Sequence, residues 1–194
     1  MELQKIAVKI FASTNDIPLT DFIDVFHGWI QASDGVYHDV ADYSHMRAGP
    51  GIVLVASHAN LSIDETNNRR GLLYSQKAHL SGSNQEKIRA VLRAALKYCR
   101  RLEQEPTLRG RLKFSDEEIF ISINDRLVAP NSQETLTALK PDLEGAVRPL
   151  VGDANFTLEH NQDPRQRFSV TARASKHFEM DKLADAPGAE TQSS

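Results

Sequence analysis

Apolar residues recur at every second position in several short segments, which is typical of strands with one buried face. Near the N-terminus, Ile6, Val8 and Ile10 alternate with charged or smaller residues. Single strands are predicted at residues 5–11, 36–42, 52–55 and 119–123, and two hairpins pair 61–64 with 71–77 and 156–160 with 167–173. Because hairpin strands are antiparallel neighbours, the pattern predicts a mainly antiparallel sheet.

Three longer segments place apolar residues three or four positions apart, the spacing that lines one face of a helix. Helices are accordingly predicted at residues 18–31, 84–105 and 132–149. Ser83 and Glu86 have the spacing of a capping box at the start of the second helix, which must end before Pro106. In the third helix, Pro141 predicts a break.

The order strand, helix, hairpin occurs twice along the chain, with one or two extra strands inserted in the first copy, which indicates a duplicated β-α-β-β unit. The units cover about residues 1–82 and 115–175, and the helix at 84–105 joins them. We therefore predict an α+β fold of ferredoxin-like character, in which a mainly antiparallel sheet carries about three helices on one face. Residues 1–175 are expected to form one globular domain, and the apolar-poor residues 176–194 a disordered tail.

Composition narrows the class of protein but not its activity. The chain has 194 residues, of which 40% are hydrophobic and 25% charged, as in soluble globular proteins. A net charge of only -3 produces no overall electrostatic field that would attract nucleic acid or an anionic membrane. The single cysteine, Cys99, excludes an intramolecular disulfide, and no segment reaches the roughly 20 apolar residues of a membrane span. We expect a cytoplasmic protein without membrane contact.

The densest group of ionisable residues lies in 37–58, which holds three histidines, two aspartates and two tyrosines in 22 residues. If 36–42 were helical, His38, Asp42 and His45 would share one helix face and could bind a divalent metal. In a strand, His38 and Asp42 would lie roughly 13 Å apart. The valines and tyrosine of this segment favour the strand, so its ionisable side chains are expected to point to opposite sides.

A ligand-binding surface is expected on the sheet face or beneath this strand and the following Gly-Pro-Gly turn. Its candidate lining residues are Asp39, Asp42, Tyr43, His45, His58 and Arg70. A metal site would require side chains of neighbouring strands to converge, and its candidates are His45, His58 and Asp64. Because the sequence contains no dinucleotide, phosphate-loop or zinc-protease motif, no cofactor is expected.

The predicted helix 84–105 is rich in basic residues, which raises a second kind of binding. Arg93, Lys97 and Arg100 belong to a face that could contact phosphate groups of RNA. The strands, however, offer Phe120 and little else as an aromatic platform for bases. A solvated helix face is therefore the preferred interpretation, and nucleic acid is not expected as a partner.

Four segments carry a resemblance to known proteins: DVADYSHMRAGPGIVLV, RRGLLYSQKA, ALKPDLEGAV and FTLEHNQDPRQRFSV. In these segments the chain resembles a family of small bacterial proteins of uncharacterised function. The resemblance extends to about Ser175 and implies a bacterial, cytoplasmic protein that folds as one piece. It implies no activity, cofactor or catalytic residue.

These observations favour a non-catalytic α+β protein that binds a small ligand or a protein partner. A homodimer is also expected, because an open antiparallel sheet leaves unpaired edge strands that a second copy can cover. The first alternative is a metal- or histidine-assisted hydrolase that uses the same histidines and aspartates. The second alternative is an RNA-binding protein that uses the basic helix.

Overall fold

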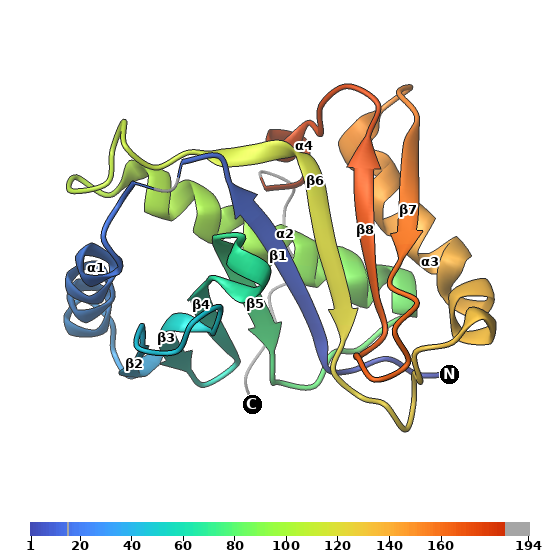
Figure 1. Ribbon diagram of the computed structural model, residues 1–194, viewed down its shortest axis with the longest axis horizontal. Helices are drawn as coiled ribbons and strands as arrows, with labels where there is room; N and C mark the ends of the chain where they lie inside the picture. Colours follow the sequence, from blue (N-terminus) through green and yellow to red (C-terminus); the bar gives the residue numbers. More distant parts are fainter. Residues whose placement is uncertain (15, 185–194) are drawn as a thin grey trace.

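The computed structural model describes residues 1–14 and 16–184, which contain one sheet of eight strands. The strands are β1 (Ile6–Ala12), β2 (Tyr37–Tyr43), β3 (Gly51–Ala56), β4 (Ala59–Asp64), β5 (Gly71–Gln76), β6 (Phe114–Ile123), β7 (Phe156–His160) and β8 (Ser169–Ala174). Their order is β2-β3-β4-β5-β1-β6-β8-β7, and every neighbouring pair is antiparallel (Figure 1). The predicted antiparallel α+β fold is thus confirmed.

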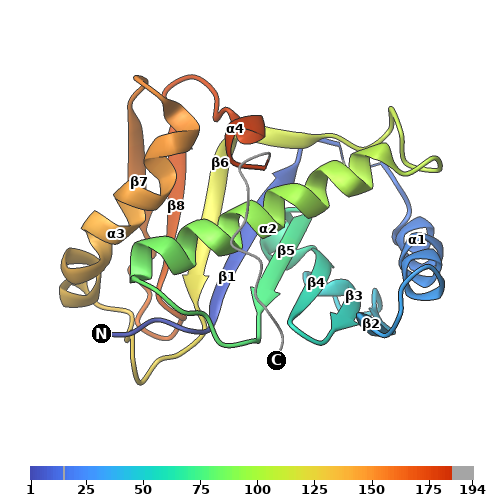
Figure 2. The same cartoon turned by 180° about the vertical axis from the view of Figure 1, so that it is seen from behind.

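Four α-helices accompany the sheet in the described part of the chain. They are α1 (Leu19–Gln31), α2 (Asn84–Gln104), α3 (Gln133–Val151) and α4 (Met180–Ala184), and a short 3-10 helix, η1 (Thr66–Asn68), connects β4 to β5. In Figure 1 the central strands face the viewer with α2 and α3 behind them, and Figure 2 shows α2 crossing the covered side of the sheet. Helix α1 packs at one end, against β2 and β3.

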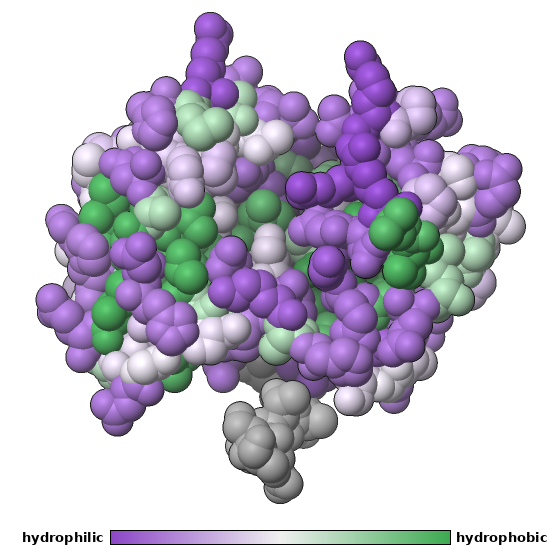
Figure 3. All heavy atoms as spheres, turned by 90° about the horizontal axis from the view of Figure 1, so that it is seen from below, coloured by the Kyte–Doolittle hydropathy of each residue, from purple (hydrophilic) through white to green (hydrophobic). Residues whose placement is uncertain are grey.

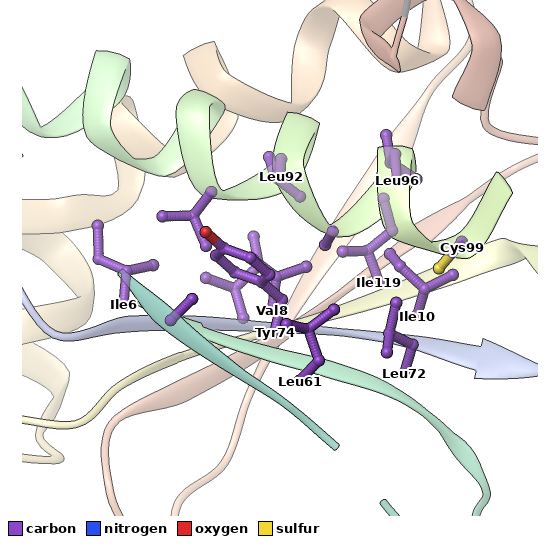
Figure 4. Close-up of a cluster of buried hydrophobic side chains, with 14 of the residues drawn as sticks. Ile6, Val8, Ile10, Leu61, Leu72, Tyr74, Leu92, Leu96, Cys99 and Ile119 are labelled. Atoms are coloured by element: carbon purple, nitrogen blue, oxygen red, sulfur yellow. The ribbon is translucent and has the colours of Figure 1, made fainter. Parts of the chain in front are cut away.

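The hydrophobic core lies between α2 and the middle of the sheet. Leu92 and Leu96 of α2 lie over Val8 and Ile10 of β1 (Figure 4), and all four side chains are buried. This contact follows from the two sequence patterns, because the apolar stripe of a helix and the apolar face of a strand can each be buried only against another element. On the surface seen from below, hydrophilic residues predominate and apolar residues form separate patches (Figure 3).

Helix α2 begins and ends where the sequence signals predict. The Ser83 hydroxyl accepts a hydrogen bond from the Glu86 backbone N–H at 3.3 Å, and the Glu86 carboxylate accepts one from the Ser83 N–H at 2.8 Å. This reciprocal pair is the predicted capping box, and it satisfies backbone donors that the first turn leaves without partners. The helix ends at Gln104, before Pro106.

The two halves of the chain pair their strands in the same way. In the first half β5 lies between β1 and β4, and in the second half β8 lies between β6 and β7. The halves meet at the antiparallel pair β1 and β6, while β2 and β3 extend the first half outward. The strand order is compatible with the predicted duplication, which, like the ferredoxin-like character, remains a prediction.

The sheet has two edges, β2 and β7. On β2 the side chains of Asp39 and Asp42 are exposed, and on β7 that of Glu159 is exposed. Charged side chains on an edge disfavour pairing with another strand. The homodimer remains a prediction. The charged side chains on β2 and β7 do not favour its formation by pairing of edge strands.

Helix α3 differs from the prediction, because it continues through Pro141 instead of breaking there. Pro141 and a second proline, Pro149, lie on the exposed side of the helix, whereas Leu139 and Leu143 are buried on the other side. Carbonyl groups that lose a partner at an exposed proline can be hydrated. Burial of the apolar side can then keep the helix continuous.

The end of the domain was also predicted too early. Residues 176–184, expected to belong to a disordered tail, include α4, and the side chains of Phe178 and Leu183 are buried at 3% exposure. Two apolar residues five positions apart give too short a pattern to reveal a helix. Residues 185–194, the remainder of that predicted tail, lie outside the described residues.

Candidate functional site

The segment around Asp39 and Asp42 is extended, as predicted, and most of its ionisable side chains face solvent. The Asp39 carboxylate accepts a hydrogen bond from the Val40 N–H, and the Asp42 carboxylate accepts one from the Ser44 N–H, each at 2.8 Å. The Ser44 donors lower the pKa of Asp42. These aspartates therefore have the local structural role that short acidic side chains commonly take in strands and turns.

The other candidates are also dispersed. Tyr43 and His45 are exposed, with ring centroids 6.5 Å apart. Arg70 is bound elsewhere, because its Nε donates to Glu65 Oε1 at 2.9 Å and its guanidinium also bonds the Ile17 carbonyl. Of the six predicted ligand-binding residues, His58 lines a cavity between α2 and the sheet, and the other five do not line it.

The metal candidates His45, His58 and Asp64 do not converge. Asp64 is buried and accepts a hydrogen bond from Lys9 Nζ at 2.5 Å and another from the Thr66 hydroxyl at 2.8 Å. In the described residues no group of three or more His, Cys, Asp or Glu side chains is arranged to hold a metal ion. The site that sequence patterns suggested is therefore not assembled.

A different set of residues forms a cavity of about 640 Å³ between α2 and the ends of β2, β4 and β5. We call it the tyrosine–arginine cavity, and its lining consists of Tyr37, His58, Tyr74, Ala94, Lys97, Tyr98, Arg100, Arg101 and Gln104. Three of these residues are tyrosines and three are basic, and none of the described lining residues is Asp or Glu. The lining thus offers hydrogen-bond donors and positive charge without an internal carboxylate.

Tyr37 reaches this cavity because β2 contains a bulge. Tyr37 pairs with Ala56, but Asp39 pairs with Val55, so the register shifts between them. Simple alternation would place Tyr37 and Asp39 on one side of the sheet. The bulge instead turns the Tyr37 ring inward, where it is 8% exposed, and leaves Asp39 in solvent.

Aromatic rings hold the cavity wall in place. The Tyr98 ring stacks on Tyr74 with centroids 5.8 Å apart and lies 6.0 Å from the ring of Trp29 in α1. The Tyr37 ring contacts Trp29 at 6.2 Å. Such contacts contribute about 0.5–1.5 kcal/mol each beyond the burial of area, so they favour this arrangement of the rings.

Arg101 is positioned by this aromatic group. Its guanidinium lies 3.8 Å from the Trp29 ring centroid, and its Nη1 donates a hydrogen bond of 2.8 Å to the Tyr37 hydroxyl. The Tyr37 hydroxyl is also 3.2 Å from that of Tyr98. Arg101 forms no ion pair with a carboxylate among residues 1–14 and 16–184. The Trp29 indole on which Arg101 lies also donates a hydrogen bond, from Nε1 to Glu105 Oε1 at 2.5 Å, so the ring is fixed from both helices.

The titration properties of the lining follow from burial. Burial raises the pKa of Tyr74 to about 12 and raises the pKa of Tyr98 as well, so both hydroxyls stay protonated at neutral pH. Burial, with a smaller contribution from the charge of Lys77, lowers the pKa of His58. At neutral pH the positive charge of the cavity therefore resides on Lys97, Arg100 and Arg101, while His58 is neutral.

The basic residues of α2 are mostly engaged within the protein. Arg89 donates to the Gly145 carbonyl of α3 at 2.9 Å, and Arg93 donates to the Leu183 carbonyl of α4 at 3.3 Å. Arg100 forms an ion pair with Asp181. The predicted solvated face is thus largely covered by α3 and α4, which the sequence pattern of α2 alone could not indicate.

Sequence reasoning missed Tyr37, Tyr98 and Arg101 as site residues. One signal was available, because Ala94, Tyr98 and Arg101 have the i, i+4, i+7 spacing of one helix face, beside the apolar stripe of α2. Nothing in the local pattern indicates that Trp29 lies against that face. The site depends on a contact between α1 and α2 that joins Trp29 and Tyr98, two residues 69 positions apart in the sequence.

Comparisons with known proteins add no functional information. No protein-family model matches the chain, and no match was found among curated proteins or solved structures. The resemblance to a bacterial family therefore remains a prediction. Among the residues that the structure describes, no helix has both the length and the apolar character needed to cross a membrane.

Proposed function

We propose that the protein binds a small organic anion in the tyrosine–arginine cavity and is not itself a catalyst. The observation that carries this proposal is the composition of the lining, which combines Arg101, Lys97 and tyrosine hydroxyls without a carboxylate among the described lining residues. Such a lining attracts negative charge and can donate several hydrogen bonds to it. An uncharged or cationic ligand would not compensate the positive charges of Lys97 and Arg101.

The size and rigidity of the cavity support a small molecule as the ligand. A volume of about 640 Å³ lies in the range of roughly 300–1,000 Å³ that ligand pockets occupy. Because Arg101 is already oriented by Trp29 and Tyr37, little conformational entropy is lost when an anion binds its free N–H groups. The rings of Tyr74 and Tyr98 supply an apolar wall for the body of the ligand.

The hydrolase alternative has less support from the same residues. The cavity holds one imidazole, His58, and among its described lining residues there is no serine, threonine, cysteine or carboxylate to act as nucleophile or to orient that imidazole. Tyr74 and Tyr98 are poor general bases, because burial raises the pKa of each. Binding is thus favoured over catalysis.

RNA binding is also less favoured. Of the three basic residues named for it, Arg93 and Arg100 bond to the α4 segment, and Lys97 is exposed beside the tyrosine–arginine cavity. A row of free cations, which would follow a phosphate backbone, is not available on the described part of α2.

Trp29, the one tryptophan of the chain, provides a direct test because Arg101 lies on its ring. Titration with benzoate and phenyl phosphate is expected to change its fluorescence, whereas uncharged benzyl alcohol should have little effect. Calorimetry provides an independent measure of affinity for Arg101→Gln, in which we expect a loss of at least about tenfold. Arg109→Gln, an exposed position on the segment after α2, is the matched control and should leave affinity unchanged. Equal affinities for the charged and uncharged probes, or full binding by Arg101→Gln, would refute the proposal.

A further inference from the structure

Arg100 lies between two cavities. It lines the tyrosine–arginine cavity together with its neighbour Arg101, and it also lines a second cavity of about 350 Å³ beside α4. On that second side its Nε donates to Asp181 Oδ1 at 3.0 Å, and a second guanidinium nitrogen bonds the same oxygen. A single side chain therefore borders the proposed ligand site and contacts α4.

Helix α4 is held by apolar burial and by a few polar contacts. Phe178 and Leu183 are buried, and the Phe178 N–H donates to the Asp116 carbonyl at 2.6 Å. Arg93 donates to the Leu183 carbonyl, and Asp181 pairs with Arg100. The Asp181 side chain is 83% exposed, so its ion pair can exchange without disruption of the core.

We infer that Asp181 is an internal competitor for the ligand, and that the ligand class is a carboxylate. This inference rests on the proposed function. The carboxylate that Arg100 already binds has the chemistry that a guanidinium at the rim of the cavity selects. Arg100 and Arg101 both line the tyrosine–arginine cavity, so a ligand carboxylate bound there competes with Asp181 for the Arg100 guanidinium. Occupancy of the cavity then weakens the attachment of α4, and attachment of α4 weakens binding to the same extent.

Substitution at Asp181 tests the competition, with benzoate as the probe. Asp181→Asn removes the competing charge and should tighten benzoate binding about two- to five-fold, which at 1.4 kcal/mol per tenfold is about 0.4–1 kcal/mol. Glu179→Gln is the control, because Glu179 carries a similar charge in the same segment but pairs with Lys182. Its affinity should equal that of the wild type. Circular dichroism should give the same spectrum for all variants.

Hydrogen exchange of the wild type provides a second measurement that needs no variant. Saturating benzoate should increase exchange of the amides in residues 178–184, and benzyl alcohol should not. If Arg101→Gln binds benzoate as the wild type does, the proposed function fails. If Arg101→Gln loses binding but Asp181→Asn binds no more tightly and exchange in 178–184 is unchanged, the cavity is a ligand site and the competition by Asp181 is wrong.

Discussion

Replacement of Lys9 by methionine tests how the protein uses the Asp64 carboxylate. Lys9 and Asp64 are each 4% exposed, and Lys9 Nζ donates to Asp64 and to the Arg69 carbonyl at 2.5 and 2.6 Å. Burial lowers the pKa of Lys9, and the charge of Asp64 opposes this effect. Methionine keeps most of the apolar stem but removes the charge, so Asp64 keeps only the N–H and hydroxyl of Thr66.

The expected loss is large, because removal of one partner leaves a buried charge without compensation. Such substitutions cost about 3–5 kcal/mol. In a chain of 194 residues, each 1 kcal/mol lowers Tm by about 2–4 °C, so the expected change is roughly 6–20 °C. The double variant Lys9→Met/Asp64→Asn should be more stable than Lys9→Met alone, since it no longer buries the unpaired carboxylate.

Urea unfolding followed by circular dichroism measures these free energies. Lys5→Met is the matched control, because Lys5 precedes the same strand but is exposed, and it should change stability by less than about 0.5 kcal/mol. A cost below about 1 kcal/mol for Lys9→Met would mean that the pair behaves as a solvated surface ion pair. The assignment of Asp64 to a structural role, and not to a metal site, would then lose its basis.

Three further predictions concern titration and capping. Tyr74 and Tyr98, whose pKa values are raised, should stay protonated near pH 11, so the absorbance at 295 nm should reach its four-tyrosinate value only after unfolding. Because the pKa of His58 is lowered from 6.5, the unfolded chain binds a proton there more readily. The free energy of unfolding should therefore fall as pH decreases from about 6.5 through the folded-state pKa, and less so in His58→Asn, as measured by urea titrations across that range. Ser83→Ala should cost about 1 kcal/mol in the same urea assay, and an unchanged midpoint would contradict the role of the Ser83–Glu86 capping box.

The elements could be predicted because their signals are local. The stripe of α2 and the alternation of Ile6, Val8 and Ile10 each depend on neighbours a few positions away. Sequence signals failed where an effect was not local. The break expected at Pro141 did not occur because burial of Leu139 and Leu143 supports the helix on its other side.

The candidate site could not be predicted, for two physical reasons. A bulge in β2 reverses the face on which Tyr37 lies, and no residue type in that segment marks the bulge. Arg101 becomes a site residue only because α1 brings Trp29 against α2. The ionisable side chains concentrated in one stretch of sequence, around Asp39, are dispersed in the structure and mostly face solvent.

The position of β1 in the middle of the sheet constrains when its two edges can be paired during synthesis of the chain. Of the eight described strands, β1 leaves the ribosome before the others, yet it pairs with β5 on one side and with β6, which ends at Ile123, on the other. A nascent chain that stops after α2 exposes one complete edge of β1, including the backbone groups that β6 later binds. Synthesis must therefore continue through β6 before β1 is paired on both sides, and fragments that end near residue 110 should self-associate.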